Sequence, residues 1–316
     1  MQNKKKFIIL ISIAIISILL YLFYGLNPVS YRFALSRRIP NLIAILITGS
    51  SIAFSTVIFQ TVANNKILTP SVLGLDSLYT LLQTAIVFIL GAYGIVEFGS
   101  YTNFFLSGIL MIFFSVLLFN LMFNKEQQNI FFLLMIGMVF GTLFGSLSSF
   151  MQRVMDTTTF LLVQNRTLAS FNNVQQSLIV ISIITLSIMF IWVVKDLKYL
   201  DVISLGREHA VNLGTDYQRL VKKLLIVVAI CVSVSTALVG PITFLGLLVA
   251  NLAYQLFNDY RHKVLISGAI LISIIALVGG QFLVERVFQF STTVGVIINF
   301  IGGIYFIYIL LKEARL

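Results

Sequence analysis

Long apolar runs separated by short polar stretches dominate the hydrophobic pattern of this 316-residue chain. Each run is close to the 20 or so apolar residues that a helix needs to cross the roughly 30 Å hydrocarbon core of a bilayer. Unpaired backbone groups are not tolerated in hydrocarbon, and the alternation typical of barrel strands is absent, so the runs are predicted to be helices. The predicted spans cover about residues 7–24, 41–61, 75–94, 102–123, 130–150, 175–195, 221–239, 242–258, 264–284 and 294–311.

The composition agrees with an all-α, polytopic membrane protein of about ten transmembrane helices. The chain is 59% hydrophobic and 10% charged, and its mean hydropathy of +1.03 lies far outside the range of soluble domains. No small-residue cleavage site follows the first run, so this run is predicted to be a retained helix. We expect one membrane domain that spans residues 1–316.

The basic residues predict which loops are cytoplasmic. With an inside N-terminus, 15 of the 21 Lys and Arg residues, including every lysine, fall in inner segments. This distribution predicts a multi-pass protein of the cell membrane with both termini in the cytoplasm. The net charge of +10 is then a topology signal and a contact with anionic lipid, not a nucleic-acid surface.

Candidate chemistry is sparse. The sequence contains no GxxxxGK[ST], HExxH or CxxC motif, and the single cysteine, Cys231, cannot form an intrachain disulfide. Asp76 lies near a helix start and Glu285 near a helix end, while His209 and His262 are interpreted as solvated loop residues. Ion-driven carriers usually need a titratable relay inside the membrane, so this pattern disfavours a secondary transporter. We predict no catalytic, cofactor or metal site.

Glycine recurs at a four-residue interval at Gly137, Gly141 and Gly145. Small residues at this spacing allow helix backbones to approach closely. We interpret the pattern as helix packing, with a smooth pathway wall at a subunit interface as the alternative.

The longest stretch dense in charge, residues 195–223, lies on the predicted inner side. Ser204 is a candidate N-cap, residues 207–213 could form about two helical turns, and Gly214 could end them. Asp216 is a second candidate cap, for the span that follows. A short capped helix at a membrane surface suits a platform for a partner, and a solvated linker is the alternative.

Several separated motifs, taken in order, resemble one family. They are Arg38-Ile39-Pro40, Asn65-Lys66-Ile67-Leu68-Thr69-Pro70, Ser204-Leu205-Gly206, Gly240-Pro241-Ile242-Thr243-Phe244-Leu245-Gly246-Leu247 and Gly302-Gly303. Together they resemble the membrane permeases of bacterial ABC importers for iron–siderophore complexes, haem and cobalamin. The stretch over residues 58–79 is similar to the subgroup that serves catecholate-type siderophores. The sequence departs from the family pattern at Asn41, Ala250-Asn251 and Thr293.

The resemblance implies a permease subunit of an ATP-driven importer that moves iron–siderophore complexes through its interface with a second permease. Haem or cobalamin is the alternative cargo, and an ion-driven secondary transporter is the alternative from another class. The implied partners are the second permease, two cytoplasmic ATPase domains and an extracytoplasmic substrate-binding protein. ATP would be bound by the partner, so the chain itself would be neither an enzyme nor a cofactor-binding protein. The chelate and the choice between a homodimer and a hetero-pair stay open.

The resemblance also assigns three groups of residues. Coupling to the ATPase is expected at Gly206, Arg207, Glu208, His209 and Gly214. Docking of the binding protein is expected at Arg37, Arg38 and Arg286, and an inner gate at Asn65 and Ile67.

Overall fold

The computed structural model describes residues 2–25, 31–123, 130–172 and 174–313, and every regular element within these ranges is a helix. The elements are α1 (Gln2–Phe23), α2 (Tyr31–Ala63), η1 (Pro70–Leu73), α3 (Leu75–Phe98), α4 (Ser100–Phe123), α5 (Ile130–Val154), α6 (Thr157–Thr167), α7 (Gln176–Val193), η2 (Leu197–Tyr199), α8 (Leu200–Ile203), α9 (Arg207–Asn212), α10 (Tyr217–Val239), α11 (Leu245–Phe257), α12 (His262–Arg286) and α13 (Val294–Glu313).

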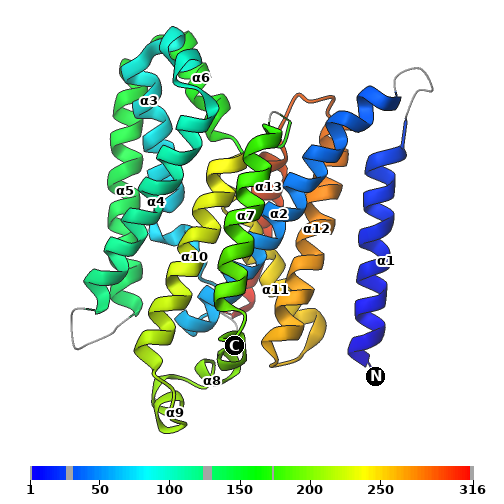
Figure 1. Ribbon diagram of the computed structural model, residues 1–316, viewed down its shortest axis with the longest axis vertical. Helices are drawn as coiled ribbons and strands as arrows, with labels where there is room; N and C mark the ends of the chain where they lie inside the picture. Colours follow the sequence, from blue (N-terminus) through cyan, green and yellow to red (C-terminus); the bar gives the residue numbers. More distant parts are fainter. Residues whose placement is uncertain (1, 26–30, 124–129, 173, 314–316) are drawn as a thin grey trace.

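Two helices, α2 and α10, form the centre of the bundle. They pack against each other, and α2 crosses the bundle obliquely (Figure 1). On one side α10 packs against α4 and α7, while α3 packs against α5 and α6. On the other side α12 packs against α1, α2 and α11, and α13 covers α11 and α12. The hydrophobic core is therefore continuous from the inner strip of α1 to α13.

The predicted all-α membrane fold is confirmed. In the described part of the chain, eight helices are long and apolar enough to cross a membrane. Two shorter apolar helices, Leu75–Gly91 of α3 and Leu245–Phe257, account for the other two predicted spans. The 13 residues of α11 extend only about 20 Å, because an α-helix rises 1.5 Å per residue. A helix of that length covers only part of the bilayer core.

The two short helices begin where the chain reverses direction inside the bundle. After α2 the chain turns at Asn64, which has a φ of 47°, and continues through η1 into α3. After α10 it turns at Gly240, which has a φ of 95°, and enters α11. The Thr243 hydroxyl donates a 2.8 Å hydrogen bond to Asp76 Oδ2 and so joins the second turn to the first turn of α3. We call the region around this bond, where η1 and the start of α3 meet residues 240–244, the helix-break junction.

Close packing of α5 against this junction explains two of the three spaced glycines. A Cβ atom on Gly137 would lie 2.8 Å from Leu73 Cα, and one on Gly141 would lie 3.2 Å from Gly74 Cα. Gly145 has nothing within 4 Å of its own Cβ position. The packing interpretation is therefore confirmed for the first two glycines and not for the third.

Apart from the short elements η1, η2 and α8, one helix was not predicted. Helix α6 has 11 residues and follows Asp156, whose carboxylate accepts a hydrogen bond from the N–H of Thr159. Hydrogen bonds from the side chain and N–H of Thr159 hold the pKa of Asp156 below its ordinary value. The segment is too short and too polar for a span, so the search for apolar runs did not detect it.

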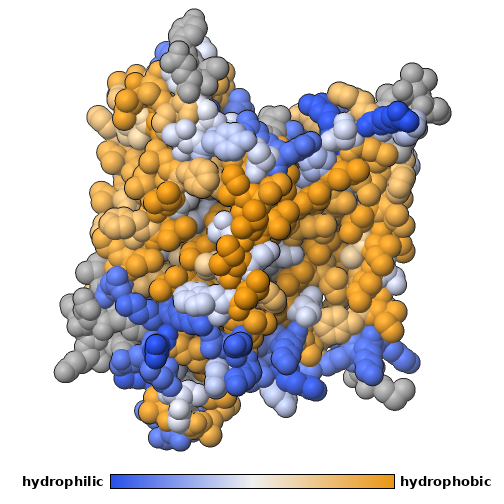
Figure 2. Space-filling model, viewed as in Figure 1, coloured by the Kyte–Doolittle hydropathy of each residue, from blue (hydrophilic) through white to orange (hydrophobic). Residues whose placement is uncertain are grey.

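The surface carries a broad apolar band with polar belts at both ends (Figure 2). Helix α1 begins and α13 ends at the same end of the bundle as α8 and α9 (Figure 1). We call this the α9 end and the opposite one the α6 end. Placing both termini on one side agrees with the even number of predicted spans, and the cytoplasmic assignment of that side stays a prediction.

Cysteine labelling in intact cells tests this assignment. A cysteine at Arg261, in the α9 end, is expected to react with a membrane-impermeant maleimide only after the cells are opened. A cysteine at Thr158, in α6, is expected to react from outside. Cys231 is buried, so the unmodified chain serves as the unreactive control. The reverse labelling pattern would contradict the predicted orientation.

Candidate functional site

The charged loop between α7 and α10 folds into η2, α8 and α9 at the α9 end of the bundle (Figure 1). The predicted short helix is present as α9, and Gly214, with a φ of 78°, follows it in the left-handed region. The predicted N-cap is wrong, because Ser204 ends α8 and its hydroxyl bonds to the Asp201 carbonyl oxygen. Gly206, with a φ of 96°, takes the N-cap position, where an L-residue would be strained.

Helix α9 presents an exposed surface of mixed chemistry. Arg207, Glu208 and His209 are exposed, so the three predicted coupling side chains are free to meet a partner. Three large apolar residues, Leu205, Val211 and Leu213, are also more than half exposed. Apolar groups gathered beyond the polar belt are not explained by burial in the bilayer, and such patches mark interaction sites.

Two contacts hold the ends of the loop. The Lys223 ammonium in α10 pairs with Asp196 at 2.5 Å and lies 4.6 Å from the ring centroid of Trp192. At the other end of the loop, Asp216 caps α10 as predicted by accepting a hydrogen bond from the N–H of Arg219. Side-chain contacts therefore fix both ends of the loop to α10.

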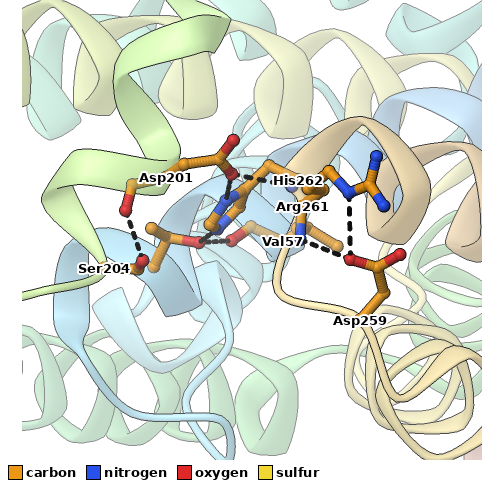
Figure 3. Close-up of polar contacts among 7 residues, drawn as sticks. Val57, Asp201, Ser204, Asp259, Arg261 and His262 are labelled. Atoms are coloured by element: carbon orange, nitrogen blue, oxygen red, sulfur yellow. Dashed lines mark hydrogen bonds and ion pairs between the residues drawn. The ribbon is translucent and has the colours of Figure 1, made fainter.

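A chain of polar contacts fixes the middle of the loop to two core helices (Figure 3). Asp201 in α8 accepts hydrogen bonds from the N–H of His262, at 2.9 Å, and from its ring Nδ1, at 2.5 Å. The other ring nitrogen, Nε2, lies 2.8 Å from Thr61 Oγ1 in α2. His262 is the first residue of α12 and is only 4% exposed. We call Asp201, His262 and Thr61 the loop anchor.

The solvated-loop interpretation is thus wrong for His262, although His209 is exposed as predicted. The Thr61 hydroxyl donates to the Val57 carbonyl oxygen, so Thr61 Oγ1 accepts from Nε2. The imidazole ring of His262 therefore lies between Asp201 of α8 and Thr61 of α2, with one ring nitrogen next to each.

Asp259 extends the polar contacts at the start of α12 towards α1. Its carboxylate accepts a hydrogen bond from the N–H of Arg261 at 3.1 Å and pairs with the same residue's guanidinium at 3.4 Å (Figure 3). The backbone bond in particular holds the pKa of Asp259 below its ordinary value. The amide of Asn3 in α1 donates to the other carboxylate oxygen at 2.8 Å.

The predicted inner-gate residues lie in the turn after α2. The Asn65 side chain accepts a hydrogen bond from the N–H of Ile67 at 2.9 Å, which closes a compact turn. The Lys66 carbonyl oxygen accepts from two amides, Gln60 of α2 at 2.6 Å and Asn251 of α11 at 3.0 Å. Asn251, a departure from the family pattern, therefore ties this turn to α11.

The predicted docking arginines lie at the α6 end in two different environments. Arg37 is exposed, and Arg286 is exposed with one bond to the Tyr24 carbonyl oxygen. Arg38 points inward instead: it bonds to the Leu22 carbonyl oxygen at 2.8 Å and lies 3.6 Å from the carboxylate of Glu285. Arg38 therefore joins α1, α2 and α12 in this structure.

Sequence reasoning missed the loop anchor. Asp201 and His262 are separated by 61 positions, and nothing in the sequence places them side by side. The available signal was the position of His262 at the start of an apolar span, where a polar residue next to a helix N-terminus is usually bonded.

Comparison with known proteins assigns the chain to a family. A family model described as the FecCD transport family matches residues 6–312. The chain belongs to the FecCD transport family. The petrobactin import system permease protein YclO of Bacillus subtilis (strain 168) is 57% identical over 100% of this chain and 99% of its own length. The corresponding FatC of Bacillus anthracis is 35% identical over 100% of this chain and 91% of its own length.

A solved structure shares the fold. It is a metal-chelate type ABC transporter in an inward-facing conformation, with a TM-score of 0.84 and 19% identity over 98% of this chain and 99% of that chain. The family match and the apolar helices identify the chain as an ABC importer permease and a multi-pass protein of the cell membrane.

A double-mutant cycle tests the loop anchor. Asp201→Asn and His262→Leu are each expected to lower the free energy of unfolding, and the double variant should lose less than the sum, by about 1 kcal/mol. Denaturant unfolding of the purified chain measures these values. Asp216→Asn is the matched control, because asparagine caps a helix as well as aspartate does. Strictly additive losses would show that the two side chains do not interact.

Proposed function

We propose that this permease imports an iron–siderophore complex of the petrobactin kind. The support is the 57% identity, over the whole chain, to a permease of a petrobactin import system. Haem and cobalamin are disfavoured on the same ground, because the most similar relatives reported above are named for petrobactin.

The same proposal makes α9 the contact for a cytoplasmic ATPase domain. The observation that carries it is the combination of an exposed α9 surface with a loop bonded to core helices. Force applied at α9 would reach α2 and α12 through the loop anchor, and α10 through the Lys223–Asp196 pair. Coupling of this kind requires contacts that differ between two conformational states of the permease. A rigid loop that is bonded to the core helices would move together with them.

ATP hydrolysis belongs to separate chains in this proposal. The sequence has no phosphate-binding loop, so two ATPase domains would supply the energy. A second permease, identical or different, would complete the pathway at the shared interface. The chain itself would perform no catalysis and bind no cofactor.

An extracytoplasmic binding protein would dock at the α6 end. Arg37 and Arg286 are the exposed guanidinium groups there, and guanidinium suits pairing with carboxylates of a partner. Arg38 is buried and already paired with Glu285, so we assign it a structural role, which is to hold α1, α2 and α12 together. The inner gate is assigned to the turn that carries Asn65 and Ile67.

Substitutions at α9 test the coupling proposal. Glu208→Arg reverses an exposed charge and leaves the bonds of the helix intact, while Gly214→Val places a β-branched residue at a φ of 78°. Both variants are expected to lose uptake of iron–siderophore in proteoliposomes that contain the complete importer. ATP hydrolysis should also stop responding to the loaded binding protein, because the signal no longer crosses α9.

The matched control is Lys222→Glu, an exposed charge reversal outside α9 in the first part of α10. It is expected to keep most of the uptake. Normal uptake and normal stimulation of ATP hydrolysis in Glu208→Arg and Gly214→Val would reduce the loop to a passive linker.

Charge reversal at the α6 end separates docking from support. Arg37→Glu and Arg286→Glu are expected to weaken binding of the binding protein by about tenfold at low salt, because like charges then face each other. Arg38→Glu should instead lower the thermal stability of the permease, since two carboxylates would meet inside the bundle. Titration in nanodiscs and thermal unfolding measure the two effects. Unchanged affinity in both exposed variants would contradict the docking proposal.

A further inference from the structure

A small polar cavity lies at the helix-break junction. Its volume is about 20 Å³, which is room for one water-sized sphere. Residues of α2, η1, α3, α10 and α11 contribute to its wall. Its polar lining consists of Thr56, Thr69, Ser71, Asp76, Thr236 and Thr243.

Asp76 is the charged member of this lining and has no basic partner. Its carboxylate accepts a 2.8 Å hydrogen bond from the hydroxyl of Thr243. None of the four ion pairs among the described residues includes it. Asp76 also lies in the first turn of α3, where the positive end of the helix dipole favours the ionised form. The Thr243 hydroxyl and the helix N-terminus favour the ionised carboxylate, and no basic side chain among the described residues forms an ion pair with it.

Three threonine hydroxyls in the cavity wall lack partners. Thr56, Thr69 and Thr236 are 1%, 6% and 4% exposed, and all three line the cavity. No side-chain hydrogen bond is formed by any of them within the described part of the chain. Buried hydroxyl groups are normally hydrogen-bonded, and the hydroxyl oxygens of these three residues are available to a ligand in the cavity.

The cavity lies deep in the bundle. Thr243 comes two residues before α11, whose 13 residues place it about 20 Å from the α9 end of that helix. A bilayer core is about 30 Å thick, so an ionised carboxylate at this depth needs a neutralising partner. Interrupted helices near the bilayer midplane are also where membrane transporters bind small cations.

We propose that this cavity binds one Na⁺ ion, held by the Asp76 carboxylate and the hydroxyl oxygens of Thr56, Thr69 and Thr236. One carboxylate matches one positive charge, and oxygen ligands suit a hard cation. Gly246 keeps the site compact, because a Cβ atom there would lie 2.1 Å from Thr56 Oγ1. The bound ion would join the turn before α3 to the turn before α11, and this role does not depend on the cargo.

Direct binding of ²²Na⁺ tests the proposal on the full-length chain in nanodiscs. We expect saturable binding of one ion per chain, displaced by unlabelled Na⁺ and not by choline. NaCl should also raise the unfolding temperature relative to choline chloride at equal ionic strength, because a ligand of the native state stabilises it.

Two variants and one control make the result specific. Asp76→Asn should abolish ²²Na⁺ binding and the Na⁺-dependent rise in unfolding temperature. Thr236→Val preserves side-chain shape and should weaken binding by about tenfold, as a lost ligand contact does. This second variant keeps the test decisive if Asp76→Asn fails to fold. Asp156→Asn removes an exposed carboxylate that caps α6 and should bind Na⁺ like the unmodified chain.

Equal ²²Na⁺ binding by the unmodified chain and Asp76→Asn would overturn the proposal. An unfolding temperature that responds to pH but not to Na⁺, and that loses this response in Asp76→Asn, would also overturn it, because a proton would then neutralise Asp76. Either result leaves the uptake assays of the α9 variants unaffected, so failure of this site is distinguishable from failure of the proposed transport function.

Discussion

The requirement that every backbone group within a bilayer find a hydrogen-bond partner governs this structure. Eight helices meet it by crossing the membrane without a long interruption. In the two turns that precede α3 and α11, the N–H groups of Val72 and Gly74 bond to backbone carbonyl oxygens and that of Phe244 bonds to the Asn299 side chain. Irregular backbone is tolerated at this depth only where protein surrounds it, and the helix-break junction satisfies that condition.

Polar side chains bond to the backbone and to one another where the helices are interrupted. Lys66 lies between α2 and η1, so its carbonyl oxygen has no partner within a helix. The side-chain amides of Gln60 and Asn251 donate hydrogen bonds to it. Thr243 and Asp76 bond across the two breaks. A transporter needs elements that can shift relative to one another, and short helices joined by side-chain bonds provide them more readily than long continuous helices.

The loop between α7 and α10 combines two properties that coupling requires. Its outer part exposes apolar and charged groups, while its inner part is bonded to α2, α10 and α12. The buried imidazole of His262 is central to this arrangement, because its two nitrogens bond to different helices. A flexible linker would absorb displacement of α9, whereas a bonded loop transmits it.

The sequence by itself determined the membrane class, the order of the ten apolar helices, the short helix at residues 207–212 and the cap at Asp216. These features follow from local hydrophobicity and local capping, so they can be derived from neighbouring residues. Motifs in order were also sufficient to indicate the permease family. Only the tertiary structure decided that His262 is buried, that Arg38 faces Glu285 and that Asp76 meets Thr243. Each of these depends on contacts between residues that lie 61 or more positions apart, and no local pattern specifies which distant side chains meet.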